Sequence, residues 1–370
     1  MKEKLKYIIF IFMLPQFSFC QNLNLIYDTV LSNEIYETSG LIFFDSKIYT
    51  INDSGNEPYI FQLDTFGNII KRIFVKNVVN TDWETLAQDS IYFFVGDIGN
   101  NNGTRTDLKI YKIKKSDLLT KDSVDVSHII KFKYGNQNNF SPTPNNTTFD
   151  AEAIICLNDT IILFSKNWLT NYTLLYKIPV DIDSCIIFPH DSIELPGMVT
   201  GTDKIDSLVF ICGYNDSLLP FLSVLNFHNK NLNTFNLANT ISISQTESIA
   251  LKDKKNFFLT SEKFIFNNNN TEYIFESKFY KFEISNYSNT FQYAKINNNK
   301  IYPNPVISKL HLENFCTKKK IIIMDVYGKQ ILSFYTENNT INLKNLKKGI
   351  YIIKINCNNQ QVYTKKIVKQ

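Results

Sequence analysis

The sequence predicts an all-β protein, built as a β-propeller followed by a small C-terminal β-sandwich. Apolar runs alternate with turns rich in Asn, Asp, Gly and Ser, and the 3.6-residue period of amphipathic helices is almost missing. Aromatic residues make up 14% of the 370 residues, which favours strands. A short strand-opening element also recurs within residues 21–295, which we assign to the propeller, whereas residues 296–370 form the second domain.

The N-terminus has the pattern of a secretory signal peptide, residues 1–20. Three lysines within the first six residues precede an apolar run at 7–14, and small residues allow cleavage after Cys20. This apolar run is too short to span a bilayer, and no other segment reaches the roughly 18 apolar residues of a membrane helix. The alternative is a lipidated Cys20, which the bulky Phe19 before it disfavours.

The repeated element is a short strand that begins with an acidic or small polar residue. Its copies are Glu37–Ile42, Asp82–Ala87, Asp150–Ile155 and Gln245–Ala250, with a degenerate copy at Met198–Asp203. A second apolar strand follows each copy and ends in polar residues. Two more strands complete each unit of roughly 47 residues, which is the size of a four-stranded propeller blade.

Five copies predict five blades. The longest interval contains the Asn- and Thr-rich stretch 136–148, which we interpret as a surface insertion. A degenerate blade hidden in residues 118–148 would make six. The strand at 24–31 precedes the first repeat and can close the circle as the outer strand of the last blade. A β-sandwich or another repeat array remains the alternative.

Candidate site residues follow from strand pairing. In an antiparallel hairpin the start of one strand lies beside the end of the next, so the opening acids and the closing polar residues should meet around the central channel. The candidate metal ligands are the opening acids Glu37, Glu84, Glu152 and Glu247. The candidate ligand-binding residues at the rim are Asp53, Asp97, Lys166 and Glu262. Oxygen-rich sites favour Ca²⁺ or Mg²⁺. Alternatively, each Glu bonds backbone amides at a blade junction, and the fourth repeat lacks a matching acid.

Several functional classes are excluded by the sequence. The four histidines form no HExxH motif, and neither a GxSxG elbow nor a Gly-rich phosphate loop is present. The net charge of +4 is scattered, unlike the basic stripe of a nucleic-acid-binding protein. An unidentified extracellular ligand bound by the channel face is therefore favoured over catalysis, and over a purely adhesive role. Whether the protein is an enzyme stays open, as does a Cys316–Cys357 disulfide.

Short strand-like runs define the C-terminal domain. They are Lys309–Glu313, Lys320–Val326, Ile331–Tyr335, Thr340–Leu343, Ile350–Asn356 and Gln361–Val368. The ordered motifs within it are Tyr302-Pro303-Asn304-Pro305, Asp325-Val326-Tyr327-Gly328-Lys329, Ile341-Asn342-Leu343, Gly349-Ile350-Tyr351 and Lys366-Ile367-Val368-Lys369. This domain resembles the C-terminal sorting domain of the type IX secretion system of Bacteroidetes-type bacteria. The resemblance implies export through the periplasm and, by the type IX machinery, secretion or display on the outer cell surface. A generic adhesive sandwich is the alternative.

The propeller also resembles known secreted propellers, on shorter motifs. A Trp-Glu pair opens the second repeat at Trp83-Glu84, and an Asp/Asn-rich turn at 52–55 follows the second strand of the first repeat. In this it is similar to calcium-dependent phosphohydrolases of the apyrase type and to phytase-like esterases. The resemblance implies a Ca²⁺ cofactor and, as the alternative function, hydrolysis of phosphate or ester bonds from the central channel.

Overall fold

The computed structural model describes residues 22–268, 271–285, 300–313, 315–325, 329–357 and 362–370. The chain divides into two compact units, Met1–Tyr287 and Ser288–Gln370. The predicted signal peptide lies outside the described residues. Within the described part of the chain, no helix combines the length and hydropathy needed to cross a membrane.

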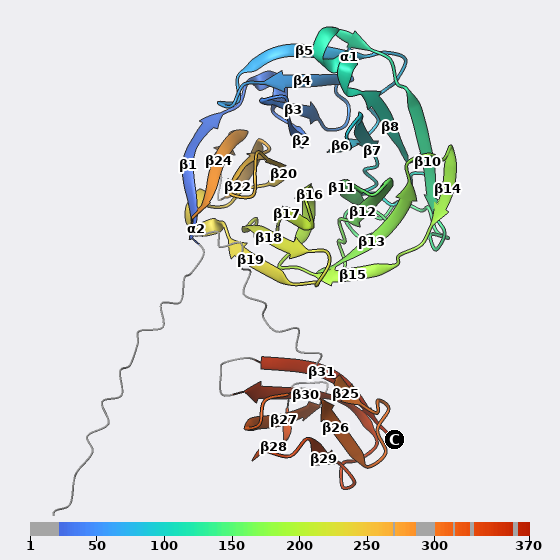
Figure 1. Cartoon of the computed structure of the whole chain (residues 1–370), viewed down its shortest axis with the longest axis vertical. Coiled ribbons are helices and arrows are strands. Elements are labelled where there is room, and N and C mark those ends of the chain that lie inside the picture. Colours follow the sequence, from blue (N-terminus) through green and yellow to red (C-terminus); the bar gives the residue numbers. More distant parts are fainter. Residues whose placement is uncertain (1–21, 269–270, 286–299, 314, 326–328, 358–361) are drawn as a thin grey trace, which may run out of the picture. The chain divides into compact units, whose positions relative to one another are not determined.

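The first unit is a five-bladed β-propeller (Figure 1). The innermost strand of each blade contacts the innermost strands of both neighbouring blades, which closes the ring. From the axis outward, the blades are β2 (Thr38–Phe44), β3 (Lys47–Asn52), β4 (Tyr59–Leu63) and β5 (Ile69–Val75); β6 (Trp83–Gln88), β7 (Tyr92–Asp97), β8 (Lys109–Lys114) and β10 (His128–Tyr134); β11 (Ala151–Leu157), β12 (Thr160–Ser165), β13 (Tyr172–Pro179) and β15 (Asp191–Glu194); β16 (Met198–Ile205), β17 (Leu208–Tyr214), β18 (Pro220–Asn226) and β19 (Leu232–Asn236); and β20 (Thr246–Leu251), β21 (Asn256–Ser261), β24 (Lys278–Ser285) and β1 (Asn22–Val30).

The ring is closed as the sequence predicts. The N-terminal strand β1 pairs antiparallel with β24, from Asn22 opposite Ser285 to Val30 opposite Lys278. The fifth blade is therefore built from both ends of the propeller sequence. The stretch suspected of hiding a sixth blade instead holds α1 (Lys115–Thr120), the two-residue strand β9 (Ser123–Val124), β10 and a loop, so five blades are confirmed.

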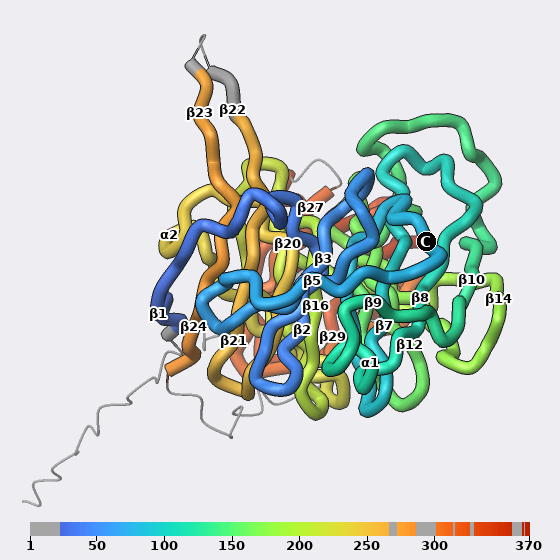
Figure 2. Tube along the Cα trace, turned by 90° about the horizontal axis from the view of Figure 1, so that it is seen from above, coloured from blue at the N-terminus to red at the C-terminus, as the bar shows by residue number. Residues whose placement is uncertain are grey.

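Three additions depart from the plain four-stranded blade. Strand β9 pairs parallel with β5 of the first blade. Strand β14 (Ser184–Ile187) leaves the third blade and pairs parallel with β10 of the second. The hairpin of β22 (Phe264–Asn268) and β23 (Thr271–Phe275) interrupts the connection from β21 to β24 and projects away from the ring (Figure 2). The 3-10 turn η1 (Asn33–Ile35) and the short helix α2 (Ala238–Ile241) lie in other connections.

The blades are held together by apolar packing between their faces. Inner strands are buried on both faces, which explains their continuous apolar runs. Between the first two blades, Tyr49 and Phe93 meet edge to face with ring centroids 5.1 Å apart, and Trp83 is fully buried. Large aromatic side chains therefore account for much of the stabilising buried area at this junction.

The second unit is a small β-sandwich. One sheet orders its strands as β25 (Lys300–Tyr302), β26 (Lys309–Glu313) and β29 (Thr340–Asn342); the other as β28 (Gln330–Thr336), β27 (Lys319–Asp325), β30 (Gly349–Cys357) and β31 (Val362–Lys369). Their inner faces share one core that includes Leu310, Ile323 and Ile353. All six predicted strands are present, and β25 is added at the entry.

Candidate metal and ligand site at the ring axis

A β-bulge lies near the start of every innermost strand. The pairing register shifts between Thr38 and Leu41, Trp83 and Thr85, Ala151 and Ala153, Val199 and Gly201, and Thr246 and Ser248. A bulge adds an unpaired residue and re-aims its side chain. Four of these added residues are Glu84, Glu152, Thr200 and Glu247, and Ser39 lies in the first-blade bulge. The bulge is what turns the repeated acid toward the axis.

The two hydroxyl-bearing bulge residues tie neighbouring blades together. Ser39 Oγ donates a hydrogen bond of 2.8 Å to the carbonyl of Trp83 on the second blade. Thr200 Oγ1 likewise donates to the carbonyl of Thr246 on the fifth blade. An ionised carboxylate cannot donate such a bond. The three glutamates are therefore unsuited to this stitch, although they are only 6–8% exposed.

The predicted alignment of Glu37 with the other glutamates is wrong by two residues. Thr38 pairs with Asn52 as Trp83 pairs with Asp97, so Glu37 is the counterpart of Asp82 and not of Glu84. The bulge hides this offset, because it breaks the simple period of two along the strand. The Glu37 carboxylate accepts a 2.6 Å hydrogen bond from Asn56 Nδ2 in the following loop.

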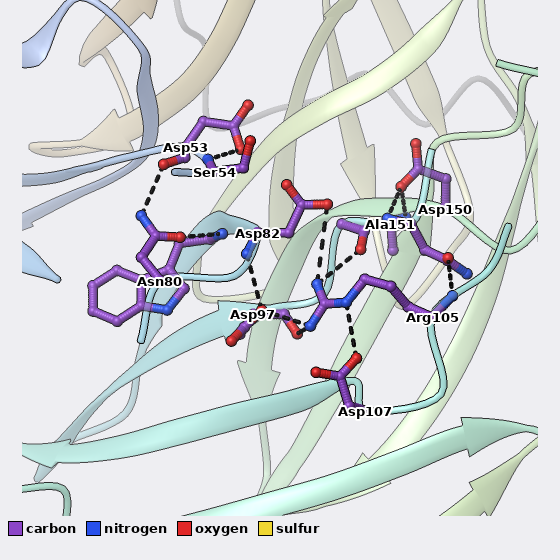
Figure 3. A network of polar contacts seen from close by, with 12 residues as sticks. Asp53, Ser54, Asn80, Asp82, Asp97, Arg105, Asp107, Asp150 and Ala151 are labelled. Carbon is purple, nitrogen blue, oxygen red and sulfur yellow. Dashed lines mark hydrogen bonds and ion pairs between the residues drawn. The ribbon is translucent and has the colours of Figure 1, made fainter. Parts of the chain in front are cut away.

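The tightest group of carboxylates comes from the first two blades. One oxygen each from Asp53, Asp82 and Glu84 lies within 4.8 Å of the other two. Figure 3 shows Asp82 between Asp53 and the arginine of the neighbouring loop. A Cβ atom added at Gly99 would lie 2.4 Å from both Asp82 Oδ2 and Glu84 Oε1. Glycine at this position therefore leaves the space that the two carboxylates occupy.

Like charges and burial perturb this group. Burial raises the pKa of Asp82 to about 7, with Asp53 as the next cause. Burial likewise raises the pKa of Glu84 well above its ordinary value, aided by Asp53 and Glu152. The pKa of Asp53 is also raised, mainly by burial. Without a counter-cation, ionising all three carboxylates near neutral pH costs free energy.

Asp97 has a different role from Asp53, although both follow a second strand. It is fully buried. Its Oδ1 is 2.7 Å from Arg105 Nη2, and it accepts the backbone N–H of Asp82 at 3.1 Å. Arg105 also binds Asp107 at 3.0 Å and lies 4.0 Å from Asp82 Oδ2 (Figure 3). Asp97 thus orients the strand that carries Asp82, and two closer acids already neutralise Arg105.

The single lysine among these acids is caged. Lys166 is 5% exposed and forms an ion pair with Glu152. Its Nζ lies 4.9 Å from the ring centroid of Trp168 and 5.5 Å from that of Tyr214. Burial opposes the charge, but Glu152 together with Tyr214 and Glu247 raises the pKa of Lys166, so it stays a cation. Oε2 of Glu152 is buried and has no hydrogen-bond partner among the described residues.

Two acids of the fifth blade complete the set. Burial raises the pKa of Glu247 to about 7. Burial, with Glu247 and Asp53 as further causes, raises the pKa of Glu262 well above its ordinary value. Glu262 donates its backbone N–H to the carbonyl of Gln245 at the base of the β22–β23 hairpin. We call the interacting residues the axial acidic cluster: Asp53, Asp82, Glu84, Glu152, Glu247 and Glu262.

The cluster brings together most of the predicted site residues but not all of them. Glu37 and Asp97 are occupied by Asn56 and Arg105, whereas Lys166 pairs within the cluster. Asp82 was missed, although an acid two residues before the bulge recurs at Asp150. Asp150 in fact does what was considered for the glutamates, because its Oδ1 accepts the backbone N–H groups of Asn100 and Ala151 at a blade junction.

The predicted sorting motif can be located in the second unit. Asn304 Oδ1 accepts the backbone N–H of Val368 at 2.8 Å, so the entry turn Tyr302-Pro303-Asn304-Pro305 is tied to the last strand. Tyr302 stacks on His311 at 5.5 Å, and Tyr351, just after Gly349, donates its hydroxyl to the carbonyl of Lys347. Gly328 lies outside the described residues. Cys316 is disulfide-bonded; the side chain of Cys357 is not among those described.

The C-terminal unit matches a known family. A model of the secretion system C-terminal sorting domain matches residues 300–370. These residues are therefore a type IX sorting domain, and the protein is exported to the cell surface or beyond it. No curated protein matches the chain.

Solved structures resemble the chain only distantly. An extracellular domain described for a hybrid two-component system of B. thetaiotaomicron is 10% identical, with a TM-score of 0.34, over 95% of this chain and 59% of that one. PorZ, a surface component of the type IX secretion system of Porphyromonas gingivalis, is 9% identical, with a TM-score of 0.29, over 90% and 51%. The chain thus spans about half the length of these proteins.

Proposed function

We propose that this exported propeller is a ligand-binding module whose axis holds a calcium ion at Asp53, Asp82 and Glu84. The observation that carries the proposal is the convergence of three carboxylate oxygens within 4.8 Å. Calcium binds oxygen at about 2.4 Å, so oxygens on opposite sides of one ion are about 4.8 Å apart. The three oxygens therefore fit the first coordination sphere of a single ion.

Electrostatics supports a cation at this position. The axial acidic cluster has six carboxyl groups, and Lys166 is the cation paired within it. A divalent ion would offset the repulsion that raises the pKa values of Asp82 and Glu84. The buried Glu152 Oε2, which has no hydrogen-bond partner among the described residues, is a further acceptor that an ion-bound water would satisfy.

The role of a bound ion would be to recognise a ligand. Three carboxylates leave three to five of the six to eight positions that calcium normally fills. Water or the oxygen atoms of an extracellular ligand would take these positions. Binding is favoured over chemistry because no activated nucleophile lies in the cluster: its lysine is held charged by Glu152.

Hydrolysis of phosphate or ester bonds is the second candidate. It is favoured by the raised pKa of Glu84, since a protonated carboxyl beside a metal ion is suited to donate a proton to a leaving group.

Thermal melting of the full-length protein tests the calcium site. Excess Ca²⁺ over EDTA should raise the melting temperature, since a ligand at 100 times its dissociation constant adds about 2.7 kcal/mol. Asp53→Asn and Glu84→Gln should abolish the rise. Asp183→Asn is the matched control, because its side chain is 94% exposed and lies outside the cluster. An unchanged melting temperature in the unmodified protein would refute the site.

A hydrolysis screen then separates the two candidates. Nucleotides, phytate and aryl phosphates are incubated with the calcium-loaded protein and with its Glu84→Gln variant. Turnover by the unmodified protein that the variant lacks would establish the hydrolase. Equal, background rates in both proteins would leave ligand binding as the function.

A further inference from the structure

A large hollow lies on the flank of the second blade, separate from the axial acidic cluster. Two adjoining cavities of about 520 and 830 Å³ share Thr106, Leu108, Phe132, Lys133 and Ile186 as lining residues. Small-molecule sites typically measure about 300–1,000 Å³ and are mostly apolar with a few polar groups. The hollow is therefore large enough for an organic ligand.

The swapped strand β14 creates one wall of this hollow. It pairs parallel with β10, which places Ile186 opposite Lys133 (Figure 1). The ring of Phe188, just after β14, lies against Gly135, where an added Cβ would be 2.2 Å from Phe188 Cζ. Glycine at position 135 thus permits the close approach that completes the wall.

The lining combines a buried apolar floor with exposed apolar walls. Leu108 and Phe132 are each 2% exposed and form part of the floor. By contrast, Phe140 is 42%, Ile186 68% and Phe188 60% exposed. Three large apolar side chains around one concave surface are costly to leave in water, which favours an apolar ligand.

Positive charge borders the apolar lining. Lys131 and Lys133 are exposed on the same face of β10, because alternate residues of a strand share a face. Lys109, opposite Lys131, adds a third amine but is held by Asp97 and Asp107 at 3.5 and 3.6 Å. In addition, the buried hydroxyl of Tyr134, a lining residue, has no hydrogen-bond partner among the described residues.

We infer that this hollow binds an amphiphilic carboxylate, a molecule with an aliphatic body and one anionic head. The body lies over Phe132, Ile186 and Phe188, where it removes exposed apolar surface from water. The head faces Lys131 and Lys133, whose charges it complements. The hollow is a second binding site, and it does not depend on calcium at the ring axis.

Calorimetric titration of the full-length protein with decanoate tests this inference, with decanamide as the uncharged counterpart. Decanoate should bind one to one and more tightly than decanamide. The double variant Lys131→Gln/Lys133→Gln should weaken decanoate binding about fivefold, as expected for two solvent-exposed charge pairs, and leave decanamide unchanged. Its control is Lys252→Gln/Lys255→Gln, which removes two exposed charges elsewhere.

The apolar wall is tested in the same titration. Ile186→Ser/Phe188→Ser should weaken both compounds more than tenfold, because most of the contact area is lost. Ile91→Ser is the control, since Ile91 is 58% exposed at a distant turn. All of these positions are on the surface, so the melting temperature should not change. Equal affinity for decanoate and decanamide, or binding unaffected by either double variant, would overturn the inference.

Discussion

Replacing Asp82 by asparagine should stabilise the calcium-free protein and remove its response to calcium. The change keeps the size of the side chain and its capacity to accept hydrogen bonds, but it removes one of three neighbouring charges. Asp82 is the middle member of the group, with Asp53 on the first blade and Glu84 two residues later on the second. Its loss therefore relieves the repulsion and takes away a proposed calcium ligand at the same time.

The size of the stabilisation follows from the pKa of Asp82. A rise from 3.8 to about 7 corresponds to roughly 4 kcal/mol of unfavourable free energy once the group is ionised in the folded protein. Because the side chain is 15% exposed and has Arg105 nearby, we take about half of this, roughly 2 kcal/mol. For a propeller of this size, that raises the melting temperature by about 4–8 °C.

The pH dependence gives the sign. Folding raises the pKa of this acid, so the folded state binds more protons than the unfolded state between pH 4 and 7, and Asp82 lowers stability as pH rises through that window. The advantage of Asp82→Asn should therefore be absent below pH 4, grow up to pH 7 and level off above it.

Scanning calorimetry in EDTA at pH 5 and pH 8, repeated with excess calcium, measures both effects. Asp183→Asn serves as the control and should match the unmodified protein under all four conditions. If Asp82→Asn melts at a lower temperature than the unmodified protein at pH 8 in EDTA, the carboxylate is stabilised by Arg105 and not strained by its neighbours. That result would refute the electrostatic reasoning.

Three further outcomes are expected. Gly99→Ala should abolish the calcium-dependent rise in melting temperature, because its Cβ would lie 2.4 Å from two proposed ligand oxygens; retention of the full rise would contradict the geometry. Lys166→Met should cost about 3 kcal/mol in urea unfolding at pH 8, since Glu152 loses its buried partner, and less at pH 5, where Glu152 is more readily protonated; an equal loss at both pH values would argue against the ion pair. Deleting residues 301–370 should leave a folded propeller in the periplasm, as judged by circular dichroism and cell fractionation, because those residues belong to a separate compact unit; its appearance at the cell surface would contradict the sorting role.

Much of the fold could be predicted from the sequence because each blade opens with a similar element. The first strand must carry a polar residue toward the axis and apolar residues toward both neighbouring blades, and that pattern survives in Asp82–Ala87 and Asp150–Ile155. The closing role of β1 could also be predicted, since the fifth blade lacked an outer strand. The swapped strand β14 and the β22–β23 hairpin were not predicted, because pairing with a neighbouring blade leaves no local mark in the sequence.

The site was predicted in kind but not in register. Glu84, Glu152 and Glu247 were identified because they share a place in the repeat. Glu37 was matched to them wrongly, since a bulge changes which residue faces the axis without changing the sequence pattern. Asp82 could have been found from its recurrence as Asp150. Its partnership with Asp53 could not, because it depends on how neighbouring blades approach each other.

Isothermal titration of calcium into the full-length protein at pH 8 tests the central claim most directly. The proposed site predicts one calcium ion per chain, with protons released on binding because the ligands have raised pKa values, and so a heat that varies with the ionisation enthalpy of the buffer. Asp53→Asn and Glu84→Gln should each remove the binding isotherm. A flat titration of the unmodified protein, or an isotherm that survives in both variants, would contradict a calcium site at the ring axis.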